Sequence, residues 1–254
     1  MSLVKSSNQT EVVDVTATTT ATTMARQDDL ALLDIAITTA KAFPRNINQF
    51  KDEVKSLINT VEIASKTWYR LKRKYLNKQT GKYEEKDICG PSVRLAEAVM
   101  NAYGNCRIQT RIKEIKKDRV IAEAIIYDLQ KNTMISVEVA RRVYGKDNED
   151  LLNLAIQSAL AIAYRNAVFK LIPRSIIDEF LHYAGEIIRN HTKNTSSISD
   201  LIEKVLVAFE KEGRKREEVL KEAGVSDLRK ATYEDYEKIQ GLYNAQYDLL
   251  NIDE

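Results

Sequence analysis

Basic and aromatic side chains alternate between Glu62 and Glu84, in an interval that contains no Asp or Glu. Lys and Arg neutralise phosphates, and exposed rings stack on unpaired bases. The combination predicts a segment that binds nucleic acid, with Trp68 in the core and with Tyr69 and Tyr75 either stacked on bases or packed inward. The candidate contacts in this basic segment are Tyr69, Arg70, Lys72, Arg73, Lys74, Tyr75, Lys78 and Lys82.

Further cations are spaced so that their side chains would lie on one face of a strand or a helix. In CRIQTRIKEI (106–115), every second position is cationic or polar, so a strand places these side chains together. They are Arg107, Gln109, Arg111 and Lys113, and we expect them to form a cationic face with the core on the other side. The remaining candidates, which could border one groove with both sets, are Arg141, Arg142, Arg165, Lys170 and Arg174.

The net charge of +2 conceals an uneven distribution of charge along the chain. The segment 63–142 contains eighteen Lys and Arg against nine Asp and Glu, whereas 199–254 contains nine against fourteen. The middle of the chain is therefore cationic and its C-terminal part acidic. This asymmetry favours a polyanionic partner for the middle segment.

The sequence lacks the motifs of the common nucleotide-dependent and hydrolytic enzymes. It has no G-x-x-x-x-G-K-[ST] loop, no G-x-G-x-x-G, no G-x-S-x-G and no H-E-x-x-H. Two Cys and two His are too few for a disulfide framework or a zinc site, so we expect no cofactor and no metal. A divalent-metal nuclease using Glu84, Glu85 and Asp87 remains as an alternative. A second acidic group at 147–150 suits the start of a helix in any case.

The elements that position these residues begin after a tail. Residues 1–26 show no apolar periodicity and predict disorder. Helices are expected over 28–43 and 47–66. The basic segment then predicts a β-hairpin around the turn signal KQTG, with a continuous helix through Leu76 as the alternative.

A helix, a β-meander and a long helix are expected next. Residues 91–105 predict the helix, and three strand-like runs follow with the short connections KKD and QKN, which suit antiparallel pairing. The apolar segment 148–172 is rich in small residues and predicts a long helix close to the sheet. The predicted fold class is α+β: a three-stranded antiparallel β-meander plus a basic β-hairpin packed on a long helix, with a small helical C-terminal subdomain.

The stretch GPSVRLAEAVMNAYGN, three antiparallel strands and then LAIQSALAIAYRNAVFKLIP together resemble the phage single-strand annealing proteins of the Red-beta, RecT and Erf type. These are distantly similar to the eukaryotic Rad-type annealing protein. Residues 88–174 carry the closest similarity, and the layout extends over most of 28–250. The segment YRNAVF departs from the pattern, because it has one arginine where the eukaryotic relatives carry a denser Lys/Arg run.

The resemblance implies single-stranded DNA binding and annealing of complementary strands without ATP or covalent catalysis, in phage-type homologous recombination. The implied partners are single-stranded DNA, the annealed duplex intermediate and further copies of the chain in a ring or helical filament. A host single-strand-binding protein or a phage exonuclease could bind the C-terminal part. The implied DNA contacts are the hairpin cations Arg70, Lys72, Arg73 and Lys74, then Arg94 on the groove wall, and Arg165 and Lys170 on the long helix.

The expected domain organisation follows from the composition and from the resemblance. Residues 1–26 form the tail, 27–190 the core for DNA binding and oligomerisation, 191–199 a linker, and 200–254 a small acidic helical subdomain. No apolar run approaches the roughly 18 residues of a membrane span, and no secretory signal is recognised, so we expect no membrane and a cytoplasmic protein, in a bacterial host if phage-encoded. A nucleic-acid-binding module that does not anneal, and a protein without nucleic acid, remain alternatives.

Overall fold

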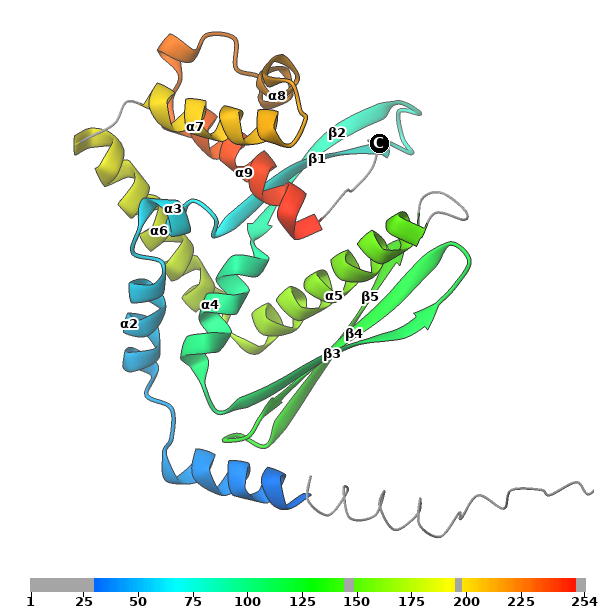
Figure 1. Ribbon diagram of the computed structural model, residues 1–254, viewed down its shortest axis with the longest axis vertical. Coiled ribbons are helices and arrows are strands. Elements are labelled where there is room, and N and C mark those ends of the chain that lie inside the picture. The colour runs from blue at the N-terminus through cyan, green and yellow to red at the C-terminus, as the bar shows by residue number, and fades with distance from the viewer. Residues whose placement is uncertain (1–29, 144–148, 195–197, 250–254) are drawn as a thin grey trace, which may run out of the picture. The chain divides into compact units, whose positions relative to one another are not determined.

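The computed structural model of this chain describes residues 30–143, 149–194 and 198–249 (Figure 1). The chain divides after Pro44 into two units. The described part of the first unit is a helix at residues 30–42, inside the helix expected there, and it exposes large apolar side chains. The tail expected at 1–26 lies outside the described residues.

The second unit contains both helices and antiparallel strands, so the predicted α+β fold class is confirmed. Its helices α2 and α3 precede the first strand, α4 lies between β2 and β3, and α5 to α9 follow the last strand. In chain order the elements are α2 (Ile47–Leu57), α3 (Val61–Ala64), β1 (Trp68–Leu76), β2 (Tyr83–Pro91), α4 (Val93–Tyr103), β3 (Cys106–Ile115), β4 (Arg119–Asp128), β5 (Thr133–Arg142), α5 (Glu149–Leu171), α6 (Arg174–Asn194), α7 (Ile198–Lys211), α8 (Arg216–Ala223), the 3-10 turn η1 (Leu228–Lys230) and α9 (Tyr233–Leu249).

The meander β3-β4-β5 buries one face under the long helix α5, as Figure 1 shows. Alternate residues of β4, among them Val120, Ala122, Ala124 and Ile126, are fully buried, because successive side chains point to opposite faces. The helix supplies Ala159, Ala163 and Ala167 to the same core. These small side chains let the helix axis lie close to the sheet, as the composition of the segment predicted.

The sequence predicted one helix over 47–66, whereas the structure has two helices, α2 and α3, in this segment. The side chain of Asn46 caps α2 by accepting from the backbone N–H groups of Asn48 and Gln49, and Thr60 caps α3 in the same way through Ile63. The chain is extended at Thr60, which has φ −119° and ψ 149°. The apolar pattern continues across this break, and for that reason the sequence predicted a single helix.

The basic segment forms the expected β-hairpin, and the continuous helix is excluded. Strands β1 and β2 pair antiparallel from Trp68 with Pro91 to Leu76 with Tyr83. The turn is closed by Asn77, whose side-chain oxygen accepts from the backbone of Gln79 at 2.9 Å. Gly81 has a φ of +67°, a left-handed conformation that glycine adopts at little cost.

The C-terminal helices share the core of the second unit and contact the hairpin. Buried residues of α7, α8 and α9 belong to the same cluster as those of α2, α4 and α5. Helix α9 crosses the start of β1: Asn244 Nδ2 donates to the carbonyl oxygens of Ser65 and Trp68, at 2.7 and 2.6 Å. Within the segment expected as a small acidic helical subdomain, α9 thus packs on β1. Helix α6 extends to Asn194, into the linker expected at 191–199, and α7 begins at Ile198.

A buried ion pair ties the start of the second unit to the meander. Arg45 Nη1 lies 3.3 Å from Asp128 Oδ2, and the Asp128 side chain is fully buried. The same guanidinium donates to the carbonyl oxygens of Tyr103 and Gly104, at 2.6 and 2.9 Å, and lies over the Tyr103 ring. The charges are therefore paired and hydrogen-bonded, which is the condition for burying them.

Candidate nucleic-acid interface

The hairpin presents two faces of different character, because side chains alternate along each strand. We call them the Arg70 face and the Tyr69 face. The Arg70 face carries Trp68, Arg70, Lys72, Lys74 and Leu76 with Tyr83, Glu85, Asp87 and Cys89, and the Tyr69 face carries Tyr69, Leu71, Arg73 and Tyr75 with Glu84, Lys86 and Ile88.

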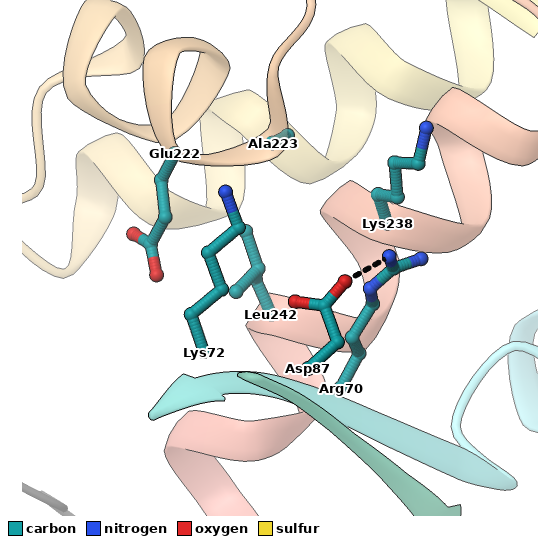
Figure 2. A pocket seen from close by; sticks show the side chains of 7 residues that line it. All are labelled: Arg70, Lys72, Asp87, Glu222, Ala223, Lys238 and Leu242. Carbon is teal, nitrogen blue, oxygen red and sulfur yellow. Dashed lines mark hydrogen bonds and ion pairs between the residues drawn. The ribbon is translucent and has the colours of Figure 1, made fainter. Parts of the chain in front are cut away.

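Protein groups cover much of the Arg70 face near the start of β1. Arg70 forms an ion pair with Asp87, and Lys74 lies 4.0 Å from Glu85. Figure 2 shows Arg70 and Lys72 beside Glu222 of α8 and Lys238 of α9, around a pocket of about 230 Å³. Cations and carboxylates alternate in this pocket, so its charge is largely compensated.

The Tyr69 face is buried near the start of β1. Tyr69 is 9% exposed and packs with Ile162 of α5 and Ala245 of α9, with Leu71 and Ile88 partly buried against them. Arg165 of α5 lies over the Tyr69 ring, 4.7 Å from its centroid, and is itself 8% exposed. Each of the two side chains thus covers the other. Within one chain the Tyr69 ring is therefore not accessible to a base, and the Arg165 guanidinium is not accessible to a phosphate.

The buried Arg165 has an incomplete set of partners among the described residues. Its Nε and Nη2 each donate to Asn166 Oδ1 at 3.3 Å, while Nη1 is buried without a hydrogen-bond partner. Trp68 is partly buried and packs against the main core, as predicted. Tyr75 keeps 43% of its surface exposed, so of the two tyrosines left open by the sequence only Tyr75 is available for stacking.

The cationic side chains of β3 share one face as predicted, and carboxylates neutralise most of that face. Arg111 forms an ion pair with Glu123 at 2.7 Å, and Lys113 forms one with Glu138. Arg111 and Ser136 both donate to Glu123, at 2.8 and 2.7 Å. Those bonds hold the pKa of the Glu123 carboxyl below its usual value, that of Ser136 contributing most. Arg107, opposite Tyr127, is exposed.

The single groove expected from the sequence is not assembled within one chain. In the strand register Arg107 lies opposite Tyr127 and Arg111 lies opposite Glu123. These side chains are on the face of the sheet that is turned away from α5. The hairpin instead contacts α5 through Ile162, on the other side of the sheet. The meander therefore separates the β3 cations from the hairpin, because alternation along β4 sends the two sets to opposite sides.

The remaining candidates are dispersed over several elements. Arg94 is exposed near the start of α4, next to the hairpin base, and Lys78 and Lys82 are exposed at the hairpin turn. Arg141 is half-buried on the α5 side of β5, whereas Arg142 is exposed on the opposite side. At the far end of α5, Lys170 is exposed, and Arg174 forms an ion pair with Asp178 at 2.8 Å.

The acidic residues of the nuclease alternative do not converge. Glu85 and Asp87 lie on the Arg70 face and Glu84 on the Tyr69 face. In the part of the chain that the structure describes, no three Asp, Glu, His or Cys side chains are grouped as a metal site would require. Of the second acidic group, Asp147 lies outside the described residues, and Glu149 and Asp150 stand in the first turn of α5.

Sequence reasoning missed one cation of the hairpin. Lys86 lies on β2 directly opposite Arg73, on the Tyr69 face, and both side chains are exposed. Lys86 stands outside the run that lacks acids, flanked by Glu85 and Asp87, so its neighbours in sequence masked it. Alternation along β2 sends both acids to the other face, and the strand register places Lys86 opposite Arg73.

Comparison with known proteins identifies no relative: no family model, no curated protein and no solved structure matches this chain. Among the described helices, none is both long and apolar enough to cross a membrane.

Proposed function

We propose that this chain binds single-stranded DNA along the hairpin and anneals complementary strands without ATP. The observation that carries the proposal is the set of exposed hairpin cations that form no ion pair in the described structure. They are Lys72, Arg73, Lys78, Lys82 and Lys86, on both strands and in the turn. The resemblance of 88–174 to phage single-strand annealing proteins supports the same function.

The mechanism needs no covalent step. Cations that contact phosphates hold a strand without reading its sequence, which leaves the bases free to pair with a second strand. One hairpin supplies few contacts, so useful affinity requires several copies of the chain along one DNA strand, as multivalent binding provides. The proposal therefore includes assembly into a ring or helical filament in phage-type homologous recombination. A contact between the C-terminal helices and a host single-strand-binding protein or phage exonuclease is part of the same proposal.

An annealing assay tests the function. Two complementary oligonucleotides are mixed at low concentration with and without the protein, in the absence of any nucleotide, and duplex formation is followed by fluorescence quenching. The proposal expects faster duplex formation with the protein. Binding without acceleration would instead identify a module that does not anneal, and no binding at all would refute the proposal.

A further inference from the structure

The Tyr69 face carries two cations that the register places directly opposite each other. Arg73 of β1 pairs with Lys86 of β2. Directly opposite residues of an antiparallel pair have Cβ atoms roughly 4.5–5.5 Å apart, and like charges at that distance destabilise the pair. Both side chains are exposed, and neither forms an ion pair within the described residues. The hairpin therefore holds a repulsion that a bound anion would relieve.

The acidic residue on the same face as this cation pair is hydrogen-bonded to residues at the turn. Within the hairpin, which is described throughout, Glu84 is the carboxylate of the Tyr69 face. It accepts hydrogen bonds from Tyr75 Oη at 2.8 Å, Asn77 Nδ2 at 2.6 Å and Thr80 Oγ1 at 3.3 Å. The bond from Tyr75 and then that from Asn77 lower the pKa of the Glu84 carboxyl. The turn thus holds the Glu84 carboxylate through three uncharged donors, and Glu84 forms no ion pair with Arg73 or Lys86.

The Arg70 face provides an internal contrast. There Asp87 pairs with Arg70, and Glu85 lies 4.0 Å from Lys74. Alternation along β2 sends both of these acids to the Arg70 face and Lys86 to the Tyr69 face. On the Arg70 face of the strands only Lys72 lacks an ion pair, and it lies opposite Asp87, whereas Arg73 and Lys86 on the Tyr69 face lie opposite each other with no carboxylate partner among the described residues.

The surroundings of the cation pair suit a nucleotide. Tyr75 follows Arg73 on the same face, toward the turn, with 43% of its surface exposed and its hydroxyl fixed by Glu84. On the other side of the pair, Leu71 and Ile88 are partly buried against α5 and α9. A strand with a phosphate on the cation pair would thus have an anchored ring beside the adjacent base, which is the combination that single-strand sites use.

We propose that Arg73 and Lys86 form a subsite for one phosphodiester group of single-stranded DNA, with Tyr75 as the platform for the neighbouring base. The inference rests on the proposed function and sharpens it. It adds Lys86, which the run of cations in the sequence did not include. It also assigns Arg70 and Lys74 to contacts within the protein and not to DNA.

The test compares two lysines of the same hairpin that lie on opposite faces. Lys86→Gln and Lys74→Gln each remove one charge, and binding of both variants to an oligothymidylate is titrated against salt. The subsite predicts that Lys86→Gln weakens binding roughly tenfold and reduces the slope of log K against log salt by about 0.7. Lys74→Gln should bind as the wild type does. Equal losses in the two variants would overturn the subsite.

A charge reversal separates binding from folding. Lys86→Glu replaces a repulsion across the strands by an attraction, so its Tm should equal or exceed that of the wild type while DNA binding falls further. A lower Tm would contradict the repulsion on which the subsite rests. If the wild type binds and anneals while the two Gln variants behave alike, only the subsite is wrong. If the wild type does not bind the oligonucleotide, the proposed function fails as well.

Discussion

Helix α9 approaches the hairpin closely at Gly241, and replacement of this residue by Ala tests that packing. A Cβ at Gly241 would lie 2.7 Å from Arg70 Cβ and 3.2 Å from the Arg70 backbone nitrogen. Carbon atoms in good contact are roughly 3.5–4.0 Å apart, so the helix or the strand must move by most of an ångström. The atoms in the way belong to the backbone and Cβ of β1, which cannot rotate aside.

The expected cost combines two opposing effects. Overpacking a close contact costs about 1–3 kcal/mol, whereas replacing Gly by Ala inside a helix gains up to about 1 kcal/mol. The net change in the free energy of unfolding for Gly241→Ala is then a loss of up to about 3 kcal/mol. For a chain of this size the corresponding fall in Tm is at most about 12 °C.

Gly185 in α6 provides the matched control. A Cβ there meets Arg189 Nη2 at 3.5 Å and Tyr233 Oη at 3.7 Å, which are ordinary contacts. Gly185→Ala should therefore stabilise the chain by up to about 1 kcal/mol. Thermal and urea denaturation of both variants measure the difference. If Gly241→Ala is as stable as Gly185→Ala, α9 does not pack on β1 as described, and the C-terminal helices form a separate body.

Three further predictions concern the site, the core and the pH dependence of stability. Tyr75→Ala should weaken single-stranded DNA binding by about 1–3 kcal/mol, while Tyr83→Ala, on the other face and 76% exposed, should leave it unchanged in a fluorescence anisotropy titration. Arg45→Met should cost about 3–5 kcal/mol of unfolding free energy in urea, because it leaves Asp128 buried without its counter-ion, and a loss below 1 kcal/mol would refute this assignment. Two lysines of α2 contact the Glu179 carboxylate, each at 2.7 Å, and lower its pKa. The contribution of Glu179 to the stability of the fold is therefore complete above the ordinary glutamate pKa and is lost as the pH falls through the lowered pKa. The difference in the free energy of unfolding between the wild type and Glu179→Gln should accordingly shrink on acidification. A difference that is independent of pH would contradict this role of Glu179.

The fold could largely be predicted from local signals. The hairpin was predicted because a segment rich in rings, with alternating side chains, leads into the turn signal KQTG. In the structure Gly81 of this turn has a positive φ. The meander was predicted because its connections are short and its apolar residues alternate. The break near Thr60 was missed, because a capping threonine inside a continuous apolar pattern does not reveal whether the helix stops.

The site could be predicted only in part, because it depends on register and packing. The sequence indicated the cationic hairpin, yet the partnership of Arg73 with Lys86 requires the strand register. The sequence also placed Arg107 and Arg111 beside the hairpin, whereas α5 covers the other face of their sheet. Whether a ring such as Tyr69 is buried depends on distant helices, which no local pattern specifies.

The central claim is that the chain itself accelerates the pairing of complementary strands. The most direct measurement is the second-order rate constant of annealing for two complementary oligonucleotides, with and without protein, in buffer free of nucleotide. We expect a faster rate with the wild type and a smaller acceleration with Lys86→Gln than with Lys74→Gln. A rate equal to that of spontaneous annealing, at protein concentrations that saturate both strands, would contradict it.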